Sequence, residues 1–328
     1  MSSKNLNTGL CILVAVLWGI LGLFIKLLDP IIQPTYQVTV RYVLSLISFI
    51  IIMTISWIYG AKGLGTYYIT HLSYLRIGRL AFSNIVVIIL ASIFGFGISI
   101  PAFFIAVSIC GVYFTYIVGI GLTVIVTALM KVLSGSEIFT KYKLGYIILL
   151  LTIIVVTTYI SKISYTGLIY VIIFSITWGL YLWLVGNINR PGRDFISKLY
   201  TTCIDMSISL AIGLISLIAF FHIGLGHVFR SILRSLSNIY TIFLMVIGIV
   251  LLCTVLPYII ICIVLSMDPT LVVNFSIIQY LEVILALLLG IFYFHELPIN
   301  NITIMYIIFS IVSLVLCMYL RALDIGKR

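Results

Sequence analysis

The chain is built from long, continuous apolar runs, and its second half nearly repeats its first. Ten runs are expected, five in each half, and short motifs recur at offsets of 156 to 160 residues. The recurring motifs are Trp18-Gly19 and Trp178-Gly179, Pro101 and Pro257, and Glu137 and Glu296. Five crossings per half is an odd number, so the second half would enter a membrane in the opposite orientation. Such inverted repeats are typical of secondary transporters, whose binding site lies near the membrane midplane.

The runs are too long for strands of a membrane barrel, which need about ten residues of alternating character. The predicted fold class is therefore an all-α polytopic membrane protein, with ten transmembrane helices as two inverted five-helix repeats at 1-162 and 163-328. The expected spans are 9-28, 36-59, 80-107, 111-134, 143-161, 165-187, 195-221, 238-266, 269-294 and 301-320. The first span is kept as a helix because it is too long for the core of a signal peptide and lacks a small-residue cleavage site.

Composition supports the membrane prediction independently. Apolar residues make up 63% of the chain and charged residues 8%, and the mean hydropathy is +1.34, all outside the range of soluble domains. The six cysteines lie in or at the ends of apolar runs with no C-x-x-C spacing. Because His222 and His227 are five residues apart, they do not share a helical face. Neither a disulfide framework, a metal site nor a cofactor is expected.

The basic residues indicate an orientation. With the N-terminus inside, 13 of the 18 Lys and Arg residues fall on the inner side and 5 on the outer side, which follows the positive-inside rule. We therefore expect a multi-pass protein of the cell membrane with both termini cytoplasmic. This distribution accounts for the net charge of +10, so no nucleic-acid partner is expected. The longest connections, 60-79 and 222-237, are expected to be loops, the first carrying a short surface helix.

Several motifs together resemble the EamA-type branch of the drug/metabolite transporter superfamily. They are Trp18-Gly19 with Phe24-Ile25-Lys26, Arg41-Tyr42, Pro257-Tyr258, Leu281-Glu282, the run from Ala286 to Gly290, and His295-Glu296-Leu297-Pro298. The family typically has Leu-Glu-Pro and Leu-Gly-Glu in the ninth helix. Here Val283 replaces the proline and His295 replaces the glycine.

The resemblance implies a bundle of two inverted repeats around a central cavity, lined mainly by helices one, three, four, six, eight and nine. It also implies small substrates such as amino acids, other metabolites, nucleotide sugars or cationic drugs. Transport in that superfamily is commonly export or exchange driven by a gradient.

Two acids lie inside predicted spans, where a charged side chain costs at least about 2.5 kcal/mol and so needs a reason. Glu282 lies near the middle of the ninth span, where burial disfavours the charged carboxylate, so it could exchange a proton or a cationic substrate. The alternative is a neutral carboxyl that is hydrogen-bonded to a neighbouring helix. Asp205 in the seventh span is a second coupling candidate, with an interhelical hydrogen bond as its simpler explanation.

Three charged residues near span ends are candidates for gating or ion pairing. Arg41 could contact an anionic substrate group, but anchoring at the membrane interface or pairing with Asp29 is the simpler expectation. Glu137 and Glu296, just past the fourth and ninth spans, are expected to be ion-paired or solvated beside the entrances.

Aromatic and polar residues in the implied cavity helices are candidates for substrate binding, since Trp and Tyr combine a stacking surface with one hydrogen-bonding group. They are Trp18, Tyr116, Trp178, Tyr181, Tyr258, Asn274 and Gln279. The alternative for the aromatic residues is an interfacial belt, and for the Trp-Gly pairs it is close helix packing alone.

No motif for catalysis is present: the sequence lacks HExxH, a Gly-rich phosphate loop, and a Ser/His/Asp arrangement. An enzyme is therefore not expected. The prediction is a secondary transporter, exporting or exchanging small organic metabolites or drugs, with proton coupling as a hypothesis. A channel or scaffold is the first alternative, and a transferase acting on a lipid-linked substrate is the second. The expected partners are a small-molecule substrate and the lipid bilayer, and a homodimer is compatible with the sequence.

Overall fold

The computed structural model describes residues 3-60, 75-77, 80-161, 163-186, 195-221, 226, 230, 233, 238-267 and 271-325, with the side chains of 3-7, 75-77, 80-82, 221, 262-263, 265-278 and 325 outside this description. Within these ranges nine helices are long and apolar enough to cross a membrane, and a shorter apolar helix spans Gln279–Tyr293. The chain is therefore a helical, multi-pass membrane protein. The predicted all-α membrane class is confirmed at this level.

The helices of the first half follow the expected spans closely. They are α1 (Ser3–Gly19), α2 (Leu21–Leu28), α3 (Pro34–Ile58), α5 (Asn84–Ser92), η1 (Ile93–Ser99), α6 (Ile100–Cys110), α7 (Val112–Leu133) and α8 (Lys141–Ile160). The first span is interrupted at Ile20, between α1 and α2, and the third is continued through η1, a π-helix.

The second half has a comparable order. Its helices are α9 (Tyr165–Val185), α10 (Phe195–Phe221), α12 (Ile239–Ile242), η2 (Phe243–Val255), α13 (Leu256–Met267), α14 (Leu271–Leu288), η3 (Leu289–Tyr293) and α15 (Asn301–Ile325). The third span of this half, like the third span of the first half, contains a π-helix, η2, followed by an α-helix, α13.

The expected third span, 80-107, is wrong at its start. Residues Leu75–Ile77 and Leu80–Phe82 form a short antiparallel pair, β1 and β2, with Leu75 opposite Phe82, and the helix begins only at Asn84. Apolar character alone cannot distinguish a short strand from the first turn of a helix. Most of the connections 60-79 and 222-237, with His222 and His227, lies outside the described residues.

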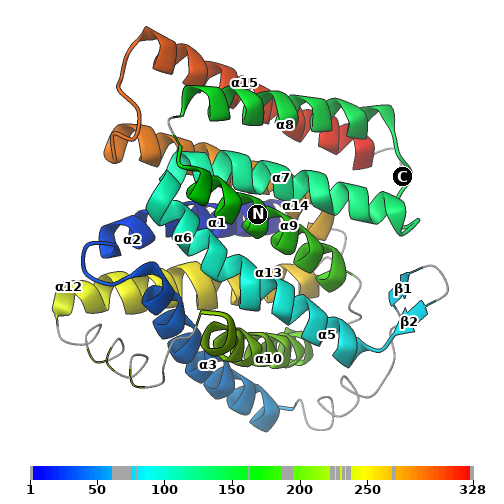
Figure 1. The fold of residues 1–328 in the computed structure, drawn as a ribbon. Helices are drawn as coiled ribbons and strands as arrows, with labels where there is room; N and C mark the ends of the chain where they lie inside the picture. The colour runs from blue at the N-terminus through cyan, green and yellow to red at the C-terminus, as the bar shows by residue number, and fades with distance from the viewer. Residues whose placement is uncertain are drawn as a thin grey trace.

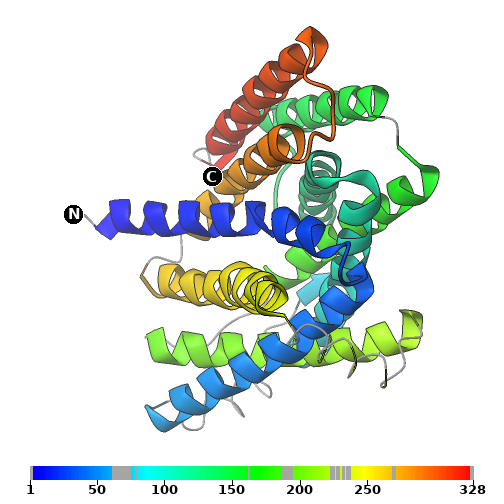
Figure 2. The same cartoon turned by 90° about the vertical axis from the view of Figure 1, so that its left-hand side faces the viewer.

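The helices form a bundle with two outer pairs. Helices α8 and α15 lie side by side along one edge, and α3 and α10 along the opposite edge, with α1, α7, α9 and α14 between them (Figure 1). Viewed from the side, α1 begins and α15 ends toward the same side of the bundle (Figure 2). The apolar core extends through both halves and leaves the outward faces rich in exposed isoleucine, leucine and valine.

Two of the three π-helices in the described part of the chain, η1 and η2, end two residues before a proline. Segment η1 precedes Pro101 in α6, and η2 precedes Pro257 in α13. A proline lacks the backbone N–H, and its ring displaces the carbonyl four residues earlier, so an α-helical turn cannot close there. The wider π turn accommodates this displacement, and π-helical turns are frequent at functional sites.

Candidate functional site

A cavity of about 50 Å³ lies between helices of both halves. Seven spans contribute to its wall: α1 and α2 together, α3, α6, α7, α9, α13 and α14. The lining residues are Trp18, Leu21, Arg41, Ile100, Phe103, Ile120, Phe174, Trp178, Tyr258, Gln279 and Glu282. The wall is thus mostly apolar and aromatic, with one basic and one acidic side chain, a composition typical of small-molecule sites.

The two Trp-Gly motifs make equivalent packing contacts beside this cavity. A Cβ atom at Gly19 would lie 3.0 Å from the side chain of Leu285 and 3.1 Å from the carbonyl oxygen of Glu282. At Gly179 it would lie 2.7 Å from the side chain of Val126 and 3.2 Å from the carbonyl oxygen of Thr123. The first helix of each half therefore packs closely on the fourth helix of the other half, and each glycine permits that approach.

Trp18 is placed by a break in the first span. In a continuous helix the N–H of Gly22 would donate to the carbonyl of Trp18; here it donates to the hydroxyl of Tyr116 over 3.1 Å. That hydroxyl donates in turn to the Trp18 carbonyl over 2.8 Å. A side chain inserted into the backbone ladder in this way interrupts a helix. Tyr116, expected to contact substrate, is fully buried and does not line the cavity; it positions Trp18 instead.

Tyr116→Phe is expected to lower stability by about 1-3 kcal/mol, because it leaves the buried Gly22 N–H and Trp18 carbonyl without their partner. Thermal unfolding of the purified protein in detergent measures the effect. Tyr159→Phe is the matched control, since Tyr159 is 91% exposed. Equal unfolding midpoints for the two variants would show that the inserted hydroxyl contributes nothing.

The candidate aromatic residues divide between the cavity wall and its support. The rings of Trp18 and Tyr258 meet edge to face with centroids 6.1 Å apart, and both residues line the cavity. Trp178 also lines it, stacked on Tyr181 with centroids 4.5 Å apart. Tyr181 was expected to bind substrate, but it faces a separate small cavity and supports Trp178 from behind.

Arg41 lies in the interior of the bundle and is 3% exposed. Its Nε donates to the hydroxyl of Thr254 over 2.9 Å, and its guanidinium carbon lies 5.6 Å from the ring centroid of Phe104. The Nη1 atom is buried with no hydrogen-bond partner among the described residues. The simpler expectation, an interfacial anchor or a pair with Asp29, is therefore wrong: Asp29 accepts from Gln37 instead.

Glu282 lines the same cavity from α14 and is 7% exposed. Among the described residues, no hydrogen bond or ion pair involves its carboxyl group, so the packing alternative, a hydrogen bond to a neighbouring helix, has no support within those residues. Gln279, one turn earlier on the same helix, shares its face and also lines the cavity. The side chain of Asn274 lies outside the described residues.

Five apolar lining residues were not singled out from the sequence: Leu21, Ile100, Phe103, Ile120 and Phe174. Four of them lie about one turn from another lining residue, since Leu21 follows Trp18 by three positions, Phe103 follows Ile100 by three, and Phe174 precedes Trp178 by four. Helical spacing from the two tryptophans could have found Leu21 and Phe174. Helix two, which contributes Arg41, was also absent from the implied lining.

Asp205 lies away from this cavity. It is 3% exposed on α10 and borders a cavity of about 10 Å³ with Tyr181, Met206 and Ser209. Nearby, the hydroxyls of Ser209 and Ser92 lie 2.9 Å apart and join α10 to α5. The two candidate coupling acids are therefore in separate places, and only Glu282 faces the central cavity.

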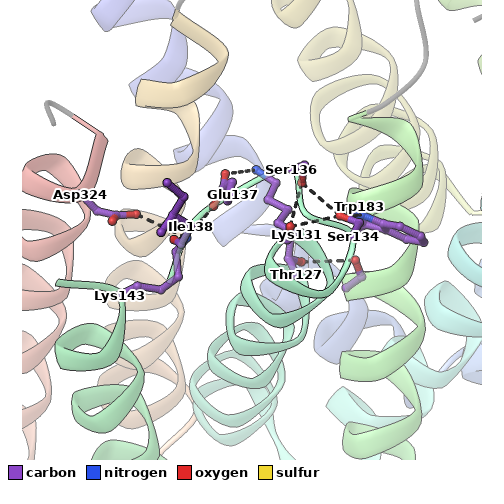
Figure 3. Close-up of polar contacts among 10 residues, drawn as sticks. Thr127, Lys131, Ser134, Ser136, Glu137, Ile138, Lys143, Trp183 and Asp324 are labelled. Atoms are coloured by element: carbon purple, nitrogen blue, oxygen red, sulfur yellow. Dashed lines mark hydrogen bonds and ion pairs between the residues drawn. The ribbon is translucent and has the colours of Figure 1, made fainter. Parts of the chain in front are cut away.

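Glu137 lies in a compact polar cluster beyond the end of α7 (Figure 3). Its carboxylate is 3.2 Å from the Nζ of Lys131 and 2.9 Å from the Nζ of Lys143. Lys143 also lies 3.9 Å from Asp324 of α15 and donates to the carbonyl of Ile138 over 2.9 Å. This cluster connects the ends of α7, α8 and α15. Of the two expectations for Glu137, ion-paired or solvated, the structure shows the ion pair.

Glu296 has a different role from its counterpart. Its two carboxylate oxygens accept from the backbone N–H groups of Val112 and Tyr113, over 2.7 and 3.1 Å, at the start of α7. Gly111 permits this contact, since its φ is +86° and a Cβ there would lie 2.5 Å from the carboxyl carbon. Burial raises the pKa of Glu296, while the two backbone donors and the charge of Lys26 oppose that rise. A carboxylate at a helix N-terminus is stabilised by the helix dipole.

No protein-family model matches the chain, and no curated protein matches it significantly.

Proposed function

We propose that the protein is a secondary active transporter of small organic metabolites or drugs, working as an exporter or exchanger with a binding site in the central cavity. The observation that carries the proposal is the cavity itself, which lies between the two halves and has Arg41 and Glu282 in its wall. Ionisable residues inside a membrane bundle mark substrate or ion pathways. The resemblance to EamA-type drug/metabolite transporters supports the same assignment.

The equivalence of the two halves supports an inverted-repeat mechanism. Gly19 packs on the carbonyl of Glu282, and Gly179 packs on the carbonyl of Thr123; both pairs are related by an offset of 159 or 160 residues. The π-helix before Pro101 has its counterpart before Pro257. In such proteins one repeat rocks against the other around a fixed site.

The ends of the fourth and ninth spans also correspond. His295, which stands where the resembled motif has glycine, has a φ of +52°, and Gly135 at the other position has a φ of +71°. This left-handed conformation favours glycine. The backbone conformation therefore explains why the resembled motif has glycine at this position, although this chain has histidine there.

We further propose that ten helices span the cell membrane with both termini in the cytoplasm. An even number of spans places both termini on one side, which agrees with the arrangement in Figure 2. On the opposite side, Glu296 joins the end of the ninth span to the start of α7. Opening toward that side requires this contact to separate.

Purified protein in liposomes tests the proposal by uptake of labelled metabolites. A transporter is expected to give saturable flux that responds to an imposed pH gradient. Flux that rises linearly with concentration and shows no saturation would favour the channel alternative.

Glu282→Gln is expected to remove the pH dependence of that flux, because the amide cannot exchange a proton. Asp205→Asn is the matched comparison, since it neutralises the acid that lies outside the central cavity. Flux with the same rate and pH dependence in Glu282→Gln as in the parent protein would contradict a coupling role, and loss of pH dependence only in Asp205→Asn would transfer that role to α10.

A further inference from the structure

The guanidinium of Arg41 is an incomplete anion site. It is a cationic group that is 3% exposed, and its contacts with Thr254 and Phe104 are both to uncharged groups. Its Nη1 has no hydrogen-bond partner among the described residues. A buried charge without a counterion is costly, so a ligand that brings an anionic group to Nη1 would be strongly favoured.

Glu282 is the acidic group in the cavity wall, yet it does not complete this site. No ion pair joins it to Arg41 among the described residues. Among the residues whose side chains the structure describes, the other titratable groups close to Glu282 are Tyr116 from α7, Cys253 from η2 and Tyr258 from α13, a phenol or thiol in each case and therefore without a full charge to pair with Arg41. From α15, Arg321 lies over the ring of Tyr146 rather than toward the cavity.

These two residues make the charge of the cavity depend on what it contains. When the cavity is empty, Glu282 lies in the same wall as Arg41 without pairing with it. When an anion occupies Arg41, an ionised Glu282 would be a second negative charge in a space of about 50 Å³, and like charges disfavour one another. Proton binding at Glu282 removes that repulsion, so anion and proton binding favour each other reciprocally.

We propose that the cavity binds a small organic anion at Arg41 together with one proton at Glu282, so that both cross the membrane as an electroneutral pair. This inference deepens the proposed transport function by assigning the substrate class and the partner ion to the same site. The cavity volume of about 50 Å³ fits a compact anion such as a short-chain carboxylate or sulfonate.

The test measures binding to the full-length protein in detergent by ligand-dependent thermal unfolding, at about pH 6 and about pH 8. Methanesulfonate is the anion and methanesulfonamide its neutral counterpart of the same size. A sulfonate stays ionised at both pH values, so any pH dependence of its binding comes from the protein. Glycine serves as a zwitterion of similar size, and all samples have the same ionic strength.

The expected result is stabilisation by methanesulfonate over methanesulfonamide, with apparent affinity about tenfold higher at the lower pH. Arg41→Gln is expected to abolish the preference for the anion, and Arg41→Lys to weaken it. Glu282→Gln is expected to keep the preference but bind equally well at both pH values. Lys141→Gln, which removes a charge from the exposed surface of α8, is expected to behave as the parent does.

Three results would overturn the inference. The first is equal binding of methanesulfonate and methanesulfonamide in the parent protein. The second is retention of the anion preference in Arg41→Gln, provided that the unliganded variant unfolds cooperatively. The third is binding of glycine that is lost in both Arg41→Gln and Glu282→Gln, which would assign a zwitterion to the two charges. Because this test measures binding and not flux, its result is independent of the transport experiment in liposomes. A failure of the anion-site proposal can therefore be distinguished from a failure of the proposed transport function.

Discussion

Lys143→Met is expected to lower the free energy of unfolding by about 3-5 kcal/mol, since it removes a buried cation that pairs with Glu137 and lies close to the buried Asp324. The Lys143 side chain is 1% exposed, while those of Glu137 and Asp324 are 12% and 3% exposed. Methionine preserves the length of the apolar stem, so the loss reports the charge rather than the packing. Thermal and denaturant unfolding of the purified protein in detergent both measure it.

The control is Lys141→Met, two positions earlier on α8 with its side chain exposed; a change within about 0.5 kcal/mol is expected there. If Lys143→Met were as stable as Lys141→Met, the cluster in Figure 3 would be an ordinary solvated group of charges. Partial recovery on neutralising Glu137 in the same variant would show that the lost pair between Lys143 and Glu137 causes the decrease in stability.

Gly19→Leu is the second change with a large expected effect. The Cβ alone would lie 3.0 Å from the side chain of Leu285 and 3.1 Å from the backbone of Glu282, and the rest of the leucine has no space between α1 and α14. Overpacking of this kind costs about 1-3 kcal/mol or more. Because the contact borders the cavity, the variant should also lose ligand binding.

Gly9→Leu provides the comparison on the same helix, since nothing lies within 4 Å of a Cβ at that position. It is expected to fold and bind as the parent does. Thermal unfolding and ligand-induced stabilisation are compared for both variants. A Gly19→Leu protein with the stability and binding of Gly9→Leu would show that α1 and α14 do not need their close approach.

Much of the bundle could be predicted from the sequence because a membrane leaves few alternatives for a backbone that must satisfy its own hydrogen bonds. The runs that begin near Val112, Tyr165 and Phe195 start within two residues of the expected positions. The interruption of the first span could not be predicted, since it depends on the hydroxyl of Tyr116, 98 positions away from Trp18.

The candidate site was predicted unevenly. Trp18, Trp178 and Glu282 lie in one cavity wall, because each is on the inner face of its helix. The positions of Tyr181, beside a separate small cavity, and of Arg41, inside the bundle, come from the structure alone, since the sequence shows a residue's depth along a span more clearly than the direction its side chain takes.

The sequence by itself determined a helical membrane protein, through the length and spacing of its apolar runs. Only the tertiary structure decided which charges share a space. Arg41 and Glu282 are 241 positions apart, and nothing in the local pattern of either helix relates one to the other. They line one cavity because the packing of the bundle places α3 and α14 around it. That packing depends on side-chain shape across the whole bundle.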